Sequence, residues 1–472
     1  MSSLARAALP SGARVGRRAA VLLLVAFAAA SGAGLGRAPV IIGEGKTALL
    51  VPALALGALA LCFGYVRPLP VLCAGMALVS FARIQPLTPA DGAIAICMLL
   101  TLVGPLRFRP TMPAGPALAL SLFTLGTVLS MTEAKVTGTA ISFEGHTIFF
   151  VFLAIWLTSA LRTNGWTREA VRWYILGAAV TAALGVLAWV IHFPGSDLFV
   201  YPNGKRIQGL YLDPNAFGPY LVPAAVICLE DLMRPRLLRW PSPLVLLTFT
   251  TLLLGVVLTF SRAATANLAL ACLVVVFVYA MRTNRRKALV RGLAILAACT
   301  VCAAGALVQT GALSILQDRA QTQGYDSQRF SNQGQAVDLG ATRLLGYGPG
   351  AVQTELSLNT HSTFVWSLFE NGILGFAALL LLVLSTAATA WRSALRDHAR
   401  EGLGAAALLG CWLGLSFNGL VVDTYHYPIL WVLAAFVWVV ASAPSSSARD
   451  MVEGSGCESA PATTRRLYAH AD

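Results

Sequence analysis

Apolar blocks of about twenty residues recur along this chain and constrain its fold more than any other feature. A helix of that length crosses the roughly 30 Å hydrocarbon core of a bilayer. Only 12% of the residues are charged, about half the share usual in soluble domains. The alternation with period two that marks a membrane β-barrel is absent from the sequence. The chain is therefore expected to be an all-α polytopic integral membrane protein.

About 12–14 transmembrane helices are expected, since the third candidate block is short and the twelfth is long. The candidate blocks are residues 19–36, 47–65, 69–83, 90–106, 113–131, 141–161, 173–193, 215–233, 241–260, 263–281, 292–312, 361–390, 402–420 and 428–442. Residues 1–35 fit either a signal peptide or a first anchor helix, and the apolar blocks that follow immediately favour the anchor. The tail, residues 443–472, has the composition of a disordered segment.

Basic residues predict which side of the membrane each connection faces. If the N-terminus is cytoplasmic, most of the 34 Lys and Arg residues fall on the cytoplasmic side, as the positive-inside rule requires. Both termini are therefore expected in the cytoplasm. The basic residues left outside are Arg37, Lys46, Arg83, Lys135, Lys205, Arg206, Arg262, Arg319, Arg329 and Arg343.

Other classes of protein fit the sequence less well. A net charge of +13 could suggest nucleic-acid binding, but the basic residues are spread through short connections instead of one face, so no nucleic-acid partner is expected. Most of the nine cysteines lie inside apolar blocks, and Cys299 and Cys302 are read as small packing residues. Neither a His/Cys/carboxylate cluster with metal spacing nor an Asp-x-Asp pair occurs, so neither a metal nor another cofactor is expected.

One outer segment runs from Lys205 to Ala216 and leads into an apolar block. Asp213-Pro214-Asn215 is typical of a turn, and Asn215 is a candidate N-cap for the helix that follows. Arg206 and Lys205 are candidates to bind an anion, although interfacial residues that meet lipid headgroups have the same pattern.

A second outer segment, Thr259-Phe260-Ser261-Arg262, separates two apolar blocks by almost nothing. Arg262 is therefore expected at or just below the outer membrane surface. A cation there is costly unless it faces the protein interior, water or an anion. We expect an anionic ligand, with simple snorkelling to the surface as the alternative.

The third outer segment is a loop over residues 313–360, far longer than a helix connection needs, and such loops are usually functional. It contains Arg329 and then Arg343, which precedes the glycine motif Gly346-Tyr347-Gly348-Pro349-Gly350. His361 follows and is expected to open the next helix, where a helix N-terminus would keep the imidazole neutral and able to accept a proton. Cations, a glycine turn and one imidazole on one membrane face suggest a lipid-linked phosphate as ligand.

The order of these motifs, from Arg206 and Asp213-Pro214-Asn215 through Ser261-Arg262, Arg329 and the glycine motif to His361, resembles the O-antigen ligase and O-antigen polymerase superfamily over residues 200–385. Two features depart from the family pattern. Ser362 follows the histidine where the family often has Asn, and Ser331-Asn332-Gln333-Gly334 weakens the amphipathic helix usual after Arg329.

The resemblance implies transfer of a glycan from a polyprenyl-diphosphate carrier to an acceptor hydroxyl of a lipid, glycan or protein, on the outer face of the cytoplasmic (inner) membrane of a bacterium. Because the sequence shows neither a metal cluster nor an evident carboxylate nucleophile, the transfer is expected to need no metal and to invert the anomeric configuration. The resemblance implies catalytic roles for His361, Arg262 and Arg206. Substrate-binding roles are implied for Arg329, Arg343, Tyr347, Gly348, Gly350 and Asn215. A ligase is favoured over a polymerase of lipid-linked repeat units. A secondary transporter or lipid flippase is the alternative from another class. The scarcity of acidic residues inside the spans and the absence of matching halves disfavour it.

The organisation expected from these observations has four parts. Residues 1–193 form N-terminal membrane helices, and 194–390 form the O-antigen ligase-like catalytic region. Residues 391–442 form C-terminal membrane helices, and 443–472 form a cytoplasmic tail.

Overall fold

The computed structural model describes residues 64–65, 67–79, 89–102, 111–202, 206–282, 286–309, 314–315, 317, 324–356 and 360–442. In this part the only strands are the short antiparallel pair β1 (Ala399–Arg400) and β2 (Leu403–Gly404). The expected span 19–36, almost all of the expected span 47–65, Lys205, Arg319 and the tail lie outside the described residues.

Each expected span that the structure describes is a helix, and its ends lie within about two helical turns of the expected ones. The apolar helices are α4 (Pro68–Leu78), α5 (Pro89–Leu102), α6 (Ala114–Ser130), α7 (Thr137–Asn164), α8 (Thr167–Ile191), α9 (Pro214–Met233), α10 (Ser242–Leu258), α11 (Arg262–Ala280), α12 (Arg286–Gln309), α16 (Thr363–Leu395), α17 (Ala405–Asn418) and α18 (Pro428–Ala441). The connections hold η1 (Met131–Glu133), η2 (Ser196–Leu198), α14 (Gly324–Gly340) and α15 (Ala351–Glu355).

Six of the described helices are long and apolar enough to cross a membrane, namely α6 with η1, α7, α8, α9, α11 and α16. Five shorter apolar helices accompany them: α4, α5, α10, α17 and α18. Many large apolar side chains on these helices stay exposed, Leu187, Leu247, Leu273 and Leu384 among them, as lipid-facing side chains do. The chain is an all-α polytopic membrane protein.

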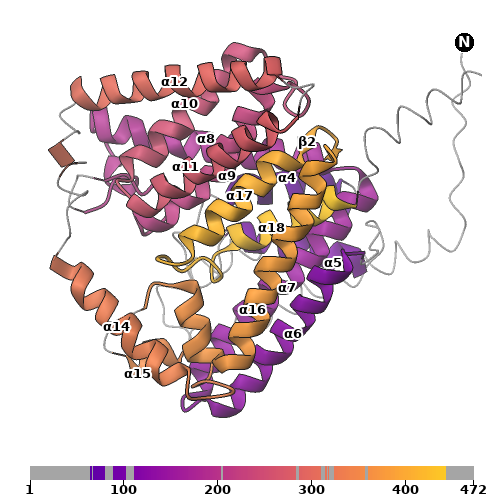
Figure 1. The fold of residues 1–472 in the computed structure, drawn as a ribbon, viewed down its shortest axis with the longest axis vertical. Coiled ribbons are helices and arrows are strands. Elements are labelled where there is room, and N and C mark those ends of the chain that lie inside the picture. Colours follow the sequence, from indigo (N-terminus) through magenta and orange to yellow (C-terminus); the bar gives the residue numbers. More distant parts are fainter. Residues whose placement is uncertain are drawn as a thin grey trace, which may run out of the picture. The chain divides into compact units, whose positions relative to one another are not determined.

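The described helices fall into two compact units, residues 1–108 and 109–472. In the first unit α4 packs against α5, and Gly75 lies against Ala93 and Ile94. The second unit holds all the other helices named above. In it α6 runs alongside α16, and α7 contacts α18 (Figure 1).

Helix α9 is the centre of the second unit. It is buried along its whole apolar length, whereas the other long spans are buried over only 33–50% of theirs. It packs against α8, α10, α11 and α17 (Figure 1). Pro214 occupies its first turn, where a missing N–H costs nothing, while Pro219 and Pro223 lie inside the helix. A buried helix can tolerate internal prolines because its neighbours satisfy the carbonyls that lose a partner.

Small residues let α11 and α17 approach closely. A Cβ added at Gly410 of α17 would meet the backbone oxygen of Ala271 at 2.5 Å, and one at Gly414 would meet Asn267. Because lipid tails are as apolar as side chains, such close packing is a main source of helix association in membranes. The α11–α17 contact therefore depends on glycine.

At one end of the second unit, three basic connections meet. Asp397, just after α16, binds Arg234 at 2.5 Å, Arg282 at 3.0 Å and Arg236 at 3.6 Å. These arginines come from connections that the charge pattern assigns to the cytoplasm, so the structure gathers residues that the positive-inside rule places on one side.

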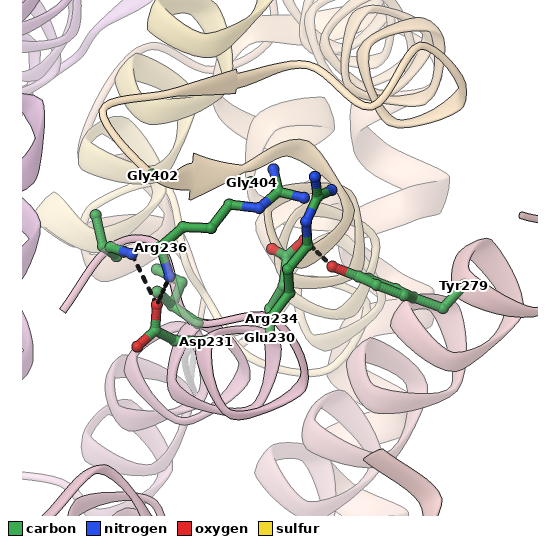
Figure 2. Close-up of a pocket in the computed structure, with 9 residues that line it drawn as sticks. Glu230, Asp231, Arg234, Arg236, Tyr279, Gly402 and Gly404 are labelled. Carbon is green, nitrogen blue, oxygen red and sulfur yellow. Dashed lines mark hydrogen bonds between the residues drawn. The ribbon is translucent and has the colours of Figure 1, made fainter. Parts of the chain in front are cut away.

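A small pocket at this end shows how the connections are fixed (Figure 2). Asp231 accepts hydrogen bonds from the backbone N–H groups of Arg236 and Leu237, at 2.9 and 2.8 Å. Glu230 accepts from the Tyr279 hydroxyl and the Ala407 N–H, both at 3.0 Å. Each buried carboxylate therefore replaces partners that a helix end or a turn leaves missing.

We expect the substitution Gly410→Ala to lower the thermal unfolding midpoint in detergent, because the new methyl group must push α17 away from α11. The cost should be about 1–3 kcal/mol, as for overpacked cores. Gly145→Ala is the matched control: Gly145 lies on an exposed face of α7 with no atom within 4 Å of an added Cβ. Equal midpoints for both variants would contradict the packing role.

Candidate functional site

Arg206 is a buried cation that joins two of the segments singled out in the sequence. Its Nε donates to the carbonyl oxygen of Thr259 at 2.7 Å, and its Nη2 donates to Asn215 Oδ1 at 2.9 Å. The backbone N–H of Ile207 also donates to the carbonyl of Leu258 at 3.0 Å. The segment before α9 and the turn between α10 and α11 therefore lie side by side.

The N-cap of α9 is Asp213, and the prediction that Asn215 fills this role is wrong. The Asp213 carboxylate accepts from the backbone N–H of Asn215 at 2.9 Å. The reason is Pro214, which is favoured at the first helical position and so makes the preceding residue the cap. Asn215 is left to bind Arg206 with its side-chain oxygen.

Arg262 is the first residue of α11, and its side chain is exposed. Buried side chains fix the turn before it. Ser261 is the N-cap, and its hydroxyl accepts from the Ala264 N–H at 3.4 Å. Thr259 and Ser261 are both buried. Thr259 thus accepts a hydrogen bond from Arg206, whereas Arg262, three residues later, reaches the surface at the same end of the bundle.

His361 lies two residues before α16, not within its first turn as the sequence suggested. Ser362 is the N-cap of that helix, and His361 before it has a left-handed φ of 53°. His361 reaches the surface, but the surrounding protein still removes part of its hydration, which lowers the pKa of His361. The Arg329 cation lowers this pKa further. Asp213 and Asp423 act in the opposite sense. The net effect favours a neutral imidazole.

Helix α14 brings Arg329 to His361. The helix continues through Ser331–Gly334, the stretch that weakens its amphipathic pattern in the sequence. Its buried positions, Asn332, Ala336 and Gly340, recur every four residues, while Gly334 falls on the exposed side, where it leaves the packing unaffected. Gln333 Nε2 donates to the carbonyl of Thr360 at 2.6 Å and fixes α14 beside the start of α16.

The glycine motif lies against a different part of the bundle. Tyr347 stacks on Phe369 with ring centroids 4.6 Å apart, and the Arg343 guanidinium covers the Tyr347 ring at 4.0 Å. Gly348, with φ of 89°, lies so close to Ala134 that no Cβ would fit. Gly350 similarly approaches Thr139. Arg343, Tyr347, Gly348 and Gly350 thus contact the α6–α7 connection and α16.

The same motif is built into a break in α16. Gly372 has φ of 64° inside that helix, and the N–H groups of Ile373 and Leu374 donate to the carbonyls of Arg343 and Leu344. The N–H groups of Tyr347 and Gly348 in turn donate to the carbonyls of Phe369 and Glu370, at 3.0 and 2.9 Å. Glycine is needed here because backbone approaches backbone.

The connection between α17 and α18 also belongs to the site, and the sequence reasoning missed it. The Thr424 N–H donates to Thr363 Oγ1 at 2.7 Å, and the Thr363 N–H donates to the carbonyl of Gly419 at 2.9 Å. This brings Asp423 within electrostatic reach of His361. A signal was available, because Asp423 and His426 are the only acid and the only histidine in the apolar stretch 402–442.

Within the described residues, no group of three or more His, Cys, Asp and Glu side chains could hold a metal ion. The residues that gather instead are Arg206, Arg262, Arg329, His361, Asp213 and Asp423. Guanidinium groups suit phosphate oxygens, and an exposed neutral imidazole can accept a proton. The described structure is therefore a polytopic membrane protein with arginines and one histidine near the helix starts at one end of its bundle.

The O-antigen ligase family model matches residues 247–380 of this chain. The match runs from α10 to the middle of α16 and includes Arg262, Arg329, the glycine motif and His361. This region is therefore similar to the O-antigen ligase family, which supports the resemblance found in the sequence. No curated protein matches the chain.

We expect Asp213→Ala to lower the unfolding midpoint, at a cost of about 0.5–2 kcal/mol, because α9 loses its cap. Asp213→Asn should keep the midpoint, since Asn caps as well as Asp. Thermal unfolding of the two purified variants in detergent measures the difference. If both variants matched the unchanged protein, Asp213 would not be the cap.

Proposed function

We propose that this protein transfers a glycan from a polyprenyl-diphosphate carrier to an acceptor hydroxyl at the outer face of the cytoplasmic membrane. The family match supports glycan transfer in general. The outer face follows from the positive-inside orientation, which assigns the arginine-rich end around Asp397 to the cytoplasm.

The observation that carries the proposal is the meeting of three capped helix starts with three arginines. Helices α9, α11 and α16 begin at the end of the bundle that holds the candidate site, and they are capped by Asp213, Ser261 and Ser362. Helix N-termini carry a partial positive charge and attract phosphate groups. Arg206, Arg262 and Arg329 add full charges beside them.

The arginines suit a diphosphate leaving group. As the bond from the anomeric carbon to the phosphate oxygen breaks, negative charge grows on the diphosphate, and donors already held in place stabilise that charge most effectively. Arg206 is held by Thr259 and Asn215, so its orientation is set before substrate arrives. Arg262 is exposed and can bind phosphate oxygens directly.

His361 is the proposed general base. It takes the proton of the acceptor hydroxyl while the acceptor oxygen bonds to the anomeric carbon. Two carboxylates lie near it, but Asp213 caps α9 and Asp423 binds His426 at 2.7 Å. Because both carboxylates already have partners, neither is placed to act as a nucleophile that forms a glycosyl-enzyme intermediate. We therefore propose a single displacement, which inverts the anomeric configuration.

We expect His361→Gln and Arg262→Ala to reduce transfer from a purified lipid-linked donor by about 10²–10⁴-fold, the usual contribution of a general base or of a stabilising charge. The measurement is product formation by the detergent-solubilised protein. His146→Ala is the matched control, since His146 lies on α7, where its Nδ1 contacts the carbonyl oxygen of Ser142 one turn earlier.

Full activity in His361→Gln, Arg262→Ala and Arg206→Ala would end the proposal. The same assay separates the two activities of the superfamily. A polymerase lengthens the lipid-linked glycan into a ladder when no second acceptor is present. A ligase, which we favour, gives product only when an acceptor is added.

The pH dependence should follow His361. Transfer requires the neutral ring, so kcat/KM falls as pH drops through its pKa, which lies below the ordinary value near 6.5. Arg329→Gln removes a cation that lowers this pKa, so the acid limb should move to higher pH by up to about one unit. Arg329→Lys keeps the charge and should leave the limb in place. If Arg329→Gln leaves the acid limb of the kcat/KM profile unchanged, His361 is not the group that titrates there.

A further inference from the structure

A second histidine, His426, lies behind the candidate site in the connection between α17 and α18. Its Nδ1 is 2.7 Å from Asp423 Oδ2, and the two side chains are only 15% and 12% exposed. Aromatic rings hold the imidazole from three sides: Tyr425 at 3.7 Å, Trp366 at 4.8 Å and Phe143 at 5.6 Å between centroids. The ring is therefore fixed in one orientation toward Asp423.

Two further carboxylates face His426 from the helices packed against it. Glu370 comes from α16 and Glu144 from α7, and both act on His426 electrostatically. Each is held by a partner of its own: the Val352 N–H donates to Glu370 at 3.1 Å, and the Thr127 hydroxyl donates to Glu144 at 2.8 Å. Burial by itself lowers the pKa of His426, but the Asp423, Glu370 and Glu144 carboxylates together raise it above the ordinary value. The three carboxylates thus favour the charged form of His426.

Asp423 interacts with two imidazoles of opposite character. It contacts His426, which is buried and favoured in its charged form, and it acts electrostatically on His361, which is exposed and favoured in its neutral form. The Thr424–Thr363 hydrogen bond holds this connection against the start of α16, so Asp423 keeps its place near His361. The other charged groups that act on His361 are Arg329 on α14 and Asp213 before α9.

We propose that His426 is a positioning residue: bonded to Asp423, it fixes that carboxylate beside the site and offsets its charge, so that His361 meets substrate as a neutral base. The inference rests on the proposed role of His361. It gives a function to an Asp–His pair that does not itself touch substrate. It also explains why an acid occurs next to a group that must stay uncharged.

The test is the pH profile of kcat/KM for transfer from the lipid-linked donor, with the full-length protein in detergent. His426→Asn keeps a donor near the position of Nδ1 but removes the charge. Asp423 is then less offset, the His361 pKa rises, and the acid limb should move to higher pH by up to about one unit. Asp423→Asn removes the negative charge, so the limb should move to lower pH. Opposite shifts support the proposal.

A further variant separates positioning from a purely structural role. His426→Leu removes both the charge and the hydrogen bond, so it should lower kcat more than His426→Asn does. If His426 were only structural, its variants would lower the yield of folded protein without moving the acid limb of the kcat/KM profile. Shifts in the same direction for His426→Asn and Asp423→Asn, or no shift in either, would overturn the inference. If His361→Gln abolishes the limb and His426→Asn leaves it unmoved, only this inference fails. If His361→Gln keeps full activity, the proposed function fails with it.

Discussion

The side chain of Arg206 joins helix ends that are far apart in sequence: its Nε reaches the carbonyl of Thr259 and its Nη2 reaches Asn215. A buried cation in a membrane protein is costly unless its donors are satisfied. Thr259 follows the last turn of α10, where carbonyls lack partners within the helix and the dipole is negative. The charge is thus held by the ends of the helices that carry the site, and the positions of α9, α10 and α11 there depend on it.

Helix starts explain where the reactive groups lie. Inside the bilayer every backbone group must be bonded, so the transmembrane segments are helices with little chemistry of their own. Polar side chains collect where helices begin and caps are needed. Arg262 follows the cap Ser261, and His361 precedes the cap Ser362. In this chain the residues that stabilise the helix ends and those proposed to act on substrate are therefore sequence neighbours.

The sequence predicted the helices well and the site in part. Apolar length alone located the membrane helices, because the bilayer sets that length, as the match of residues 215–233 with α9 (Pro214–Met233) shows. A local rule failed where a neighbour decides: Pro214 made Asp213 the cap. Asp423 and His426 are the only acid and the only histidine of the stretch 402–442, but the sequence does not show which residues they meet. Their place near the site depends on contacts with Thr363 and Phe143, which are distant in sequence.

The glycine motif connects to the site indirectly, through α16. Its backbone occupies the break at Gly372, and the segment just after it binds the Glu370 carboxylate through the Val352 N–H. Glu370 in turn faces His426, which binds Asp423 next to His361. A motif for which the family resemblance implies substrate binding can therefore serve the site by setting the shape and charge of the helix behind it. Gly346 is required because its backbone lies against Glu370 and Gly372 at the break in that helix, and Gly348 is required because it lies against Ala134.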